Sequence, residues 1–186
     1  MLERNILESV RQLVKNEAEE DDWKYHIVPV VKYAKELAKI FNADEDVAEL
    51  AALLHDIGRL RFDGGDHDVT GVPEVEKILK ELNCPSEIID EVKHCVESHR
   101  GSKDVAPKTI IAKIIANSDA MAHFDILPVF FFWRSQDSSF EESFKWVDEK
   151  IDRDWNKKLT LPEARKLMED KHNAIKLILD ANREYI

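Results

Sequence analysis

The sequence has few of the residues that interrupt helices or cross-link chains. Its 186 residues include only five glycines, six prolines and two cysteines. Strand-like alternation is nearly absent, and apolar residues recur at three-and-four spacing, which predicts an all-α fold. Because Cys84 and Cys95 lack CxxC spacing, we expect reduced thiols rather than a disulfide.

Basic residues are also in short supply. The chain carries 27 Lys and Arg against 38 Asp and Glu, a formal net charge of −11. Such a balance argues against general binding to nucleic acids or to anionic membranes, because both require a basic face. The negative net charge is compatible with a small phosphorylated substrate, because binding such a substrate requires only a locally positive pocket or a metal ion.

Long apolar runs are missing as well. The longest, residues 126–133, is far shorter than the roughly 20 residues that cross a bilayer as a helix. Residues 1–22 are acidic and amphipathic, without the apolar region of a signal peptide. The sequence therefore predicts a soluble cytoplasmic protein with one domain, or a core domain and an appendage.

Apolar spacing and capping residues divide the chain into expected helices. These are residues 2–18; a helix capped by Asp21 or Asp22; one from the Asp44 cap to His55 and Asp56, closed by Gly58; one after Gly71; one after Ser86; one over about 108–124; and two opened by capping boxes at Ser139 and Thr160. Residues 59–68 are expected as a polar loop. The patch at 126–133 has four open roles: lid, pocket wall, interface, or core under the last two helices.

A histidine and an aspartate stand side by side at the end of the third helix. His55 and Asp56 follow an apolar run, and neighbouring side chains on a helix point about 100° apart, so both cannot join one apolar stripe. A metal ion would satisfy imidazole and carboxylate together. The alternative is an ordinary helix end, with His55 near the negative end of the helix dipole.

Two other residues lie on expected apolar faces. His99 falls in the stripe of Val92 and Cys95, whereas His94 faces the other way. Asp119 lies in a helix that is apolar almost all round, where a carboxylate needs a partner. That partner is a metal ion or, alternatively, Lys113 or a backbone amide.

Together with His26 and His67, these residues occur in the order H, HD, H, H, D. The segments YHIVPVVKYAKELAK, AALLHDIGRL and IIANSDAM make residues 20–125 resemble the HD-domain superfamily of metal-dependent phosphohydrolases. The resemblance implies an HD-type helical domain over 1–125, with 126–186 as a helical extension packed on it. The GYP-type extension of cyclic-dinucleotide hydrolases is not present after His99.

The resemblance also implies a ligand set. One divalent ion would be bound by His26, His55, Asp56 and Asp119. Members of the family with two ions add two histidines, whose positions His67 and His99 match, with Asp56 bridging both ions. The metal identity is left open among Mn, Fe, Ni, Co, Zn and Mg.

The implied reaction is the hydrolysis of a small phosphoester, for instance a nucleotide, with His55 and Asp56 as the catalytic centre. Candidate phosphate contacts are Arg59, Arg61, Arg100 and Lys103, and exposed surface charge is the alternative for each. Asp66 and Asp68 are candidates for a base or for orienting His67, and ordinary solvated loop acids are the alternative. His123 lies one turn beyond Asp119 and could reach the mouth of the site.

Two other functions stay open. One is a two-iron oxygenase that uses the same ligands. The other is a non-catalytic nucleotide sensor whose last helices bind a partner or form a homo-oligomer.

Overall fold

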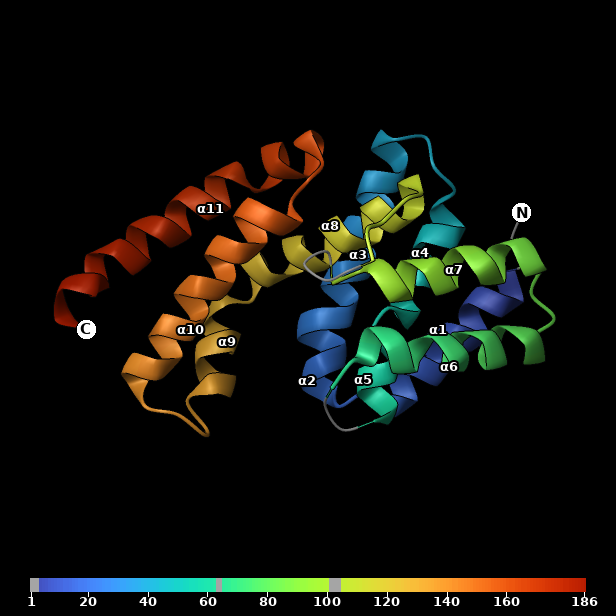
Figure 1. The fold of residues 1–186 in the computed structure, drawn as a ribbon, viewed down its shortest axis with the longest axis horizontal. Coiled ribbons are helices and arrows are strands. Elements are labelled where there is room, and N and C mark those ends of the chain that lie inside the picture. The colour runs from blue at the N-terminus through green and yellow to red at the C-terminus, as the bar shows by residue number, and fades with distance from the viewer. Residues whose placement is uncertain (1–3, 63–64, 101–104) are drawn as a thin grey trace.

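The computed structural model describes residues 4–62, 65–100 and 105–186, and every regular element within these ranges is helical (Figure 1). This confirms the all-α fold. The elements are α1 (Arg4–Glu17), α2 (Glu20–Asp22), the π-helical turn η1 (Trp23–Ile27), α3 (Val28–Ile40), α4 (Glu45–Leu54), α5 (Ile57–Arg61), α6 (His67–Glu81), α7 (Ser86–Ser98), α8 (Ile110–Asp125), α9 (Leu127–Arg134), α10 (Phe140–Arg153), the π-helical turn η2 (Asp154–Lys158), α11 (Pro162–Asn182) and the 3₁₀ turn η3 (Arg183–Tyr185).

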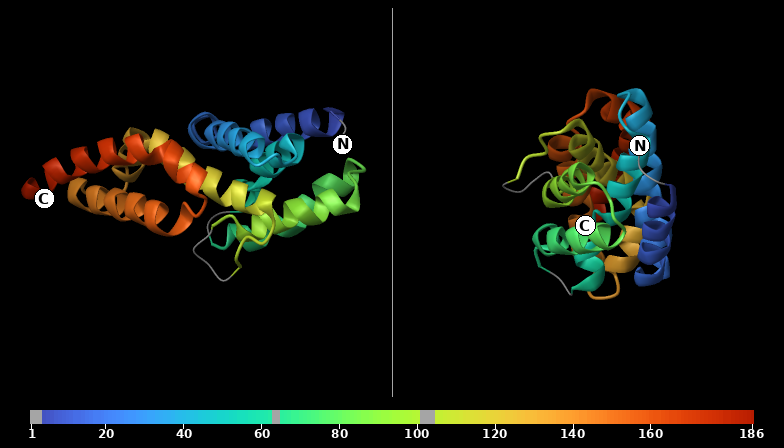
Figure 2. Two further views of the ribbon diagram at one scale, coloured as in Figure 1. Left: turned by 90° about the horizontal axis from the view of Figure 1, so that it is seen from above. Right: turned by 90° about the vertical axis from the view of Figure 1, so that its right-hand side faces the viewer.

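Helix α8 is the central element of the molecule. It packs on α3, α4 and α7 on one side and on η2 and α11 on the other. The whole molecule is elongated, with α9, α10 and α11 at one end and the N-terminal helices at the other (Figure 2). All residues of α8 from Ile114 to Phe124 are buried, as its all-round apolar sequence predicts. One continuous core therefore joins the first helices to the C-terminal extension.

Helix α4 is held at both its start and its middle. The Asp44 carboxylate accepts hydrogen bonds from the amides of Asp46 (3.0 Å) and Val47 (3.1 Å), which confirms the predicted cap. Glu49 is buried in the same helix and forms ion pairs with Arg11 of α1 and Lys35 of α3. These contacts fix the helix that ends at His55.

Four predicted helix limits were wrong, and two of them concern the starts of α2 and α6. Glu19, not Asp21 or Asp22, precedes the second helix, and both aspartates lie in its first turn. Helix α6 begins at His67 rather than after Gly71, because α5 already forms over part of the predicted loop. The capping box at Ser139 is confirmed.

Thr160 does not cap α11. Its hydroxyl oxygen instead accepts a hydrogen bond from the Asn117 side chain (3.1 Å), and the helix begins after Leu161. The Thr160 hydroxyl oxygen, which the capping pattern predicted to accept from an amide of α11, therefore accepts from a side chain of α8 instead.

The prediction that Gly58 ends the third helix is wrong. Gly58 lies in α5, where a Cβ atom would collide with the carbonyl oxygen of His67 and lie 2.7 Å from the amide nitrogen of Gly71. The absent side chain lets α5 approach α6 closely. That approach brings His67 next to the end of α4.

Within the described ranges, none of the helices combines the length and the apolar character that crossing a bilayer would require.

Candidate metal centre

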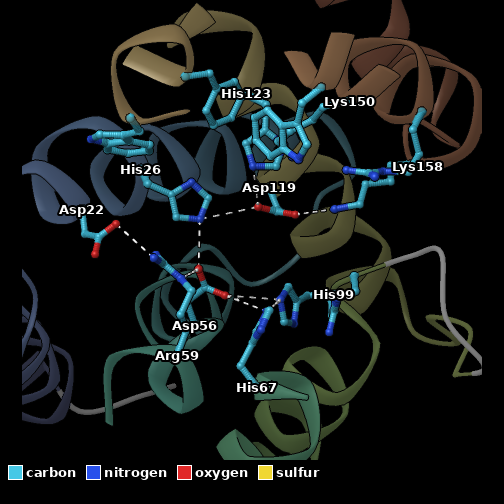
Figure 3. Close-up of a pocket in the computed structure, with 15 residues that line it drawn as sticks. Asp22, His26, Asp56, Arg59, His67, His99, Asp119, His123, Lys150 and Lys158 are labelled. Carbon is cyan, nitrogen blue, oxygen red and sulfur yellow. Dashed lines mark hydrogen bonds and ion pairs between the residues drawn. The ribbon is translucent and has the colours of Figure 1, made fainter. Parts of the chain in front are cut away.

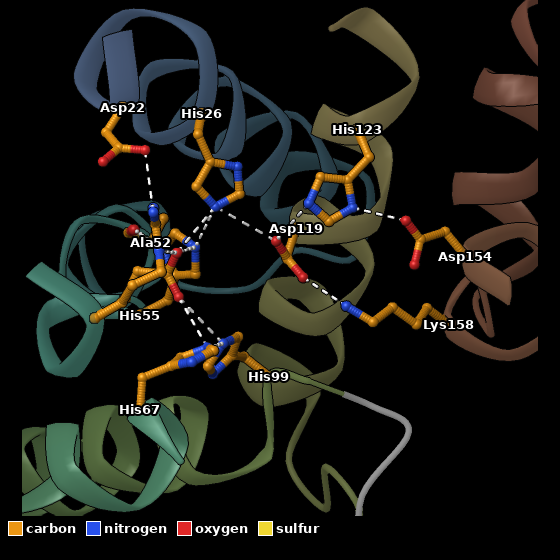
Figure 4. Close-up of polar contacts among 12 residues, drawn as sticks. Asp22, His26, Ala52, His55, His67, His99, Asp119, His123, Asp154 and Lys158 are labelled. Carbon is orange, nitrogen blue, oxygen red and sulfur yellow. Dashed lines mark hydrogen bonds and ion pairs between the residues drawn. The ribbon is translucent and has the colours of Figure 1, made fainter. Parts of the chain in front are cut away.

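The six predicted metal-site residues converge on one place (Figures 3 and 4). His26 comes from the π-helical turn η1, where the wider turn directly precedes Pro29, which cannot donate an α-helical hydrogen bond. The HD pair connects α4 to α5, while Asp119 lies on α8. His67 starts α6 and His99 caps α7. All except His67 are buried.

His26 and His55 form a facing pair on one oxygen of Asp56. Their Nε2 atoms are 3.1 Å apart and lie 3.2 and 3.6 Å, respectively, from Asp56 Oδ2. His55 Nδ1 is 2.7 Å from the carbonyl oxygen of Ala52, an atom that can only accept. The hydrogen of a neutral His55 ring is therefore on Nδ1, and its Nε2 lone pair points toward His26 and Asp56.

His67 and His99 repeat this arrangement on the other oxygen. Their Nε2 atoms are 3.2 Å apart and lie 3.3 and 3.4 Å from Asp56 Oδ1. His99 Nδ1 donates to the carbonyl oxygen of Val96 (2.7 Å). Asp56 thus stands between the two histidine pairs, with one oxygen facing each.

The chemistry of this donor set fits a cation. Nitrogen lone pairs that face each other beside a carboxylate repel unless a proton or a metal ion lies between them. Burial lowers the pKa of His55 to about 3, so protonation of His55 is costly. Burial also lowers the pKa of His67, but the hydrogen bond and charge of Asp56 outweigh burial at His99 and raise its pKa.

Asp56 itself stays ionised. Burial raises the pKa of its carboxyl group, but His55, the hydrogen bonds from His26 and His99, and Arg59 together hold that pKa well below the usual range. The described residues include three groups whose donor atoms could hold a metal ion: His26–His55–Asp56, Asp56–His67–His99 and His26–Asp119–His123.

Asp119 has a protein partner that the sequence analysis did not name. Its Oδ2 accepts a hydrogen bond from Lys158 Nζ (2.8 Å), a buried lysine of η2, and its Oδ1 lies 3.6 Å from His26 Nε2. Burial raises the pKa of Asp119, but the charges of Lys158 and His123 hold it well below the usual range. Lys113, the partner considered from the sequence, is exposed.

His123 lies closer to the centre than the sequence analysis expected. Its ring is buried and stacks on His26 with 5.5 Å between centroids and an interplanar angle of 6°. Nε2 lies 3.4 Å from Asp119 Oδ1, and Nδ1 lies 2.8 Å from Asp154 Oδ2. The signal in the sequence was the i, i+4 spacing of Asp119 and His123 on a buried helix, which places both on one face.

The predicted phosphate contacts have mixed outcomes. Arg59 donates to Asp56 Oδ2 (2.9 Å) and to Asp22 (3.1 Å). Arg100 donates to Asp68 (3.1 Å). Both arginines also line the pocket over the centre. Arg61 pairs with Glu17 and Glu74 instead. Lys103 lies outside the described residues.

The pocket over the centre has a volume of about 440 Å³ and two different sides (Figure 3). The histidines and aspartates form one side. The C-terminal extension supplies the other, with Phe130, Trp133, Trp146, Lys150, Arg153 and Lys158. The apolar patch of residues 126–133 thus provides a pocket wall, and Phe130 is the one residue of α9 that is buried. No sequence motif marked these extension residues, because their position depends on how α10 and η2 fold back on α8.

A family model for the HD domain matches residues 23–123. Two archaeal proteins also match part of the chain. The tRNA (cytidine(56)-2'-O)-methyltransferase of Picrophilus torridus is 32% identical over 127 residues, which cover 61% of this chain and 35% of that protein. An uncharacterised protein of Methanocaldococcus jannaschii is 33% identical over 113 residues, or 50% of this chain and 62% of that protein. The chain therefore spans only about a third to three fifths of the length of these curated relatives.

Solved structures with this fold cover nearly the whole chain. Bacillus subtilis YpgQ in complex with ADP superimposes with a TM-score of 0.72 at 21% identity, over 97% of this chain and 95% of that one. A predicted HD superfamily hydrolase from an uncultured Thermotogales bacterium gives a TM-score of 0.61 at 24% identity, over 98% and 92% of the two chains. These likenesses extend the shared fold into the C-terminal helices. Since the HD model matches more than half of the sequence, from before His26 to beyond Asp119, the protein belongs to the HD domain family.

Proposed function

We propose that the protein is a metal-dependent phosphohydrolase that acts on a small phosphoester of the nucleotide type. One observation carries the proposal: the pocket joins a convergent histidine and aspartate centre on one side to lysines, an arginine and tryptophans on the other. Phosphate hydrolysis needs both, because the transferred group is negatively charged and catalysis rests on its positioning and on electrostatics.

The first ion would be held by His26, His55, Asp56 and Asp119. A second would be held by His67 and His99, with Asp56 shared through its other oxygen. Such a centre supplies Lewis acidity, which activates water near neutral pH and offsets charge on a phosphoryl oxygen. The Nδ1 hydrogen bonds of His55 and His99 to backbone carbonyls hold both rings in the tautomer that ligation requires.

The remaining side chains of the pocket have separate tasks. Arg59 already holds Asp56 Oδ2 and Asp22, so we assign it to orienting the shared carboxylate as much as to substrate. Lys150 and Arg153 line the opposite wall, where an ammonium and a guanidinium can meet phosphate oxygens. Arg100 lies on the side of His67 and His99.

Aromatic residues support a nucleotide as the substrate. Trp133 and Trp146 line the pocket, and an indole ring is a surface on which a base can stack. A protein with the same fold, Bacillus subtilis YpgQ, has been solved with ADP. Both observations favour a base-bearing phosphoester over a simple sugar phosphate.

The shared position of Asp56 also suits a two-iron oxygenase. Lys150, Arg153 and the arginines around the pocket favour phosphate chemistry instead. Measuring the iron content and the EPR signal of protein purified without added metal separates the two functions. A mixed-valent two-iron signal together with substrate oxidation would support the oxygenase.

The test of the proposal is a phosphatase screen of nucleotides and simple phosphoesters with Mn²⁺, Ni²⁺, Co²⁺, Mg²⁺ and Fe²⁺. We expect phosphate or pyrophosphate release that requires a metal and is lost in Asp56→Ala. His94→Gln serves as the matched control, because His94 lies on α7 outside the pocket and accepts from the Lys108 amide. Nucleotide binding without turnover under all metals would favour the sensor function and contradict hydrolysis.

A further inference from the structure

His123 shares three features with the histidines of the candidate metal centre. It is buried, its Nε2 faces a carboxylate oxygen, and its Nδ1 meets a fixed acceptor. His55 and His99 have the same arrangement, with backbone carbonyls as the acceptors of Nδ1–H. A histidine that binds a metal through Nε2 commonly donates its Nδ1–H to a carboxylate or a carbonyl.

The contact with Asp154 fixes the hydrogen on the His123 ring. Asp154 is fully buried, and its Oδ2 lies 2.8 Å from Nδ1. An ionised carboxylate only accepts hydrogen bonds, so Nδ1 carries the hydrogen. Lys150 Nζ donates to the same oxygen (3.2 Å). The Nε2 atom of a neutral ring is then an acceptor, and it faces another acceptor, Asp119 Oδ1, at 3.4 Å.

Two acceptors in contact need a positive centre between them. Lys150 Nζ lies 3.1 Å from Nδ1, the other nitrogen of the ring, and therefore does not supply a positive charge between Nε2 and Asp119 Oδ1. The separations fit a metal ion, since Asp119 Oδ1 lies 3.4 Å from His123 Nε2 and 3.6 Å from His26 Nε2. Ligand atoms about 2.1 Å from a shared ion are expected at such separations.

We infer that His123 is a ligand of the ion held by His26 and Asp119, and that Asp154 orients it from the C-terminal extension. The inference rests on the proposed metal centre and adds a histidine that the HD ligand pattern does not include. The His123 ring stacks parallel to the His26 ring, and the Nε2 atoms of both rings point to the same oxygen of Asp119 (Figure 4). The extension thereby helps to build the metal centre as well as the pocket wall.

The direct test is long-range ¹H–¹⁵N NMR of the histidine rings during titration of the chelator-treated protein with Zn²⁺. Single histidine variants assign the signals. We expect the Nε2 resonance of His123 to leave the range of an unprotonated nitrogen at the same metal equivalent as that of His26. His94 should not move, since it lies outside the pocket.

Two substitutions extend the test to affinity. His123→Gln and Asp154→Asn should each weaken Co²⁺ binding by about 10- to 100-fold in calorimetry. Both should also change the visible spectrum of bound Co²⁺, while His94→Gln should leave affinity and spectrum unchanged. Circular dichroism and the Tm of the metal-free variants establish that they fold; if one does not, the NMR titration of the native protein still decides.

The outcomes separate this inference from the proposed function. If Zn²⁺ shifts His26 and His55 but leaves the His123 nitrogens unchanged, the metal centre stands and the role of His123 is overturned. If no histidine nitrogen resonance shifts and no Co²⁺ binds, both the role of His123 and the proposed function are overturned.

Discussion

The two sides of the pocket differ in how they acquire their polar residues. On the side of the HD pair, histidines from separate helices meet the carboxylate of Asp56 at similar distances, 3.2 to 3.6 Å. On the side of the extension, two lysines and two aspartates are buried and paired with one another. The first side combines facing histidine nitrogens with a carboxylate, a donor set that fits metal ions, and Arg59 is an ion-pair partner of that carboxylate. On the second side, Lys150 and Lys158 are paired with Asp154 and Asp119, and Arg153 also lines the pocket.

The two sides meet at Asp119. One of its oxygens faces His26 and His123, and the other receives Lys158. A metal ion and an ammonium group would thus share one carboxylate. Lys158 of η2, in the C-terminal extension, is thus a partner of a residue within the HD match.

The largest expected effect comes from the centre of the HD side. Asp56→Ala removes the carboxylate between both histidine pairs, and we expect kcat to fall by about 1000-fold or more, since metal electrostatics contribute several kcal/mol. Steady-state kinetics at saturating metal measure this. Asp90→Ala, an exposed acid on α7, is the control. Activity within about twofold of the native protein would remove Asp56 from the mechanism.

The next effect tests the extension side. Lys158→Met leaves Asp119 buried without its ammonium partner, and losing one member of a buried pair costs about 3–5 kcal/mol. We expect that loss in denaturant unfolding of the metal-free protein, with a smaller loss when a divalent ion is present. The exposed neighbour Lys157 gives the control variant, Lys157→Met. Equal losses with and without metal would show that no ion compensates Asp119.

Gly58→Ala tests whether the two histidine pairs of the HD side bind separate ions. The added methyl group would collide with the carbonyl oxygen of His67, and such overpacking costs about 1–3 kcal/mol. Because the strain moves His67 but not His26, we expect the weaker of two metal-binding events to be lost and the tighter one kept. Calorimetric titration with Mn²⁺ measures both. Loss of the tighter event instead would contradict the division into two histidine pairs.

The smallest expected effect concerns substrate choice. Stacking on an aromatic ring contributes about 1–3 kcal/mol per base, so Trp146→Ala should raise KM for a nucleotide at least about fivefold. The same variant should leave KM for p-nitrophenyl phosphate nearly unchanged. Equal changes for both substrates would mean that Trp146 shapes the pocket without contacting a base.

The sequence predicted the helices and the HD side better than it predicted the extension side. Apolar periodicity located α1, α4, α7 and α8, and it placed His99 on an inward face. It missed that His67 starts a helix, because the close contact of Gly58 with α6 is a tertiary effect. The roles of Lys158 and Asp154 had no local signal, since charged residues on an amphipathic helix usually face water. His123 had the right spacing from Asp119, but its importance emerges only with Asp154 in place.

We propose that the histidines and aspartates of this pocket bind divalent metal ions. The most direct test is calorimetric titration of the chelator-treated protein with Mn²⁺, in the native form and as Asp56→Ala. We predict one or two ions bound per native chain, and none bound with comparable affinity by the folded variant. A native protein that binds no Mn²⁺, Fe²⁺, Co²⁺, Ni²⁺, Zn²⁺ or Mg²⁺, or a variant that binds as the native protein does, would show that Asp56 and its histidines are not a metal centre.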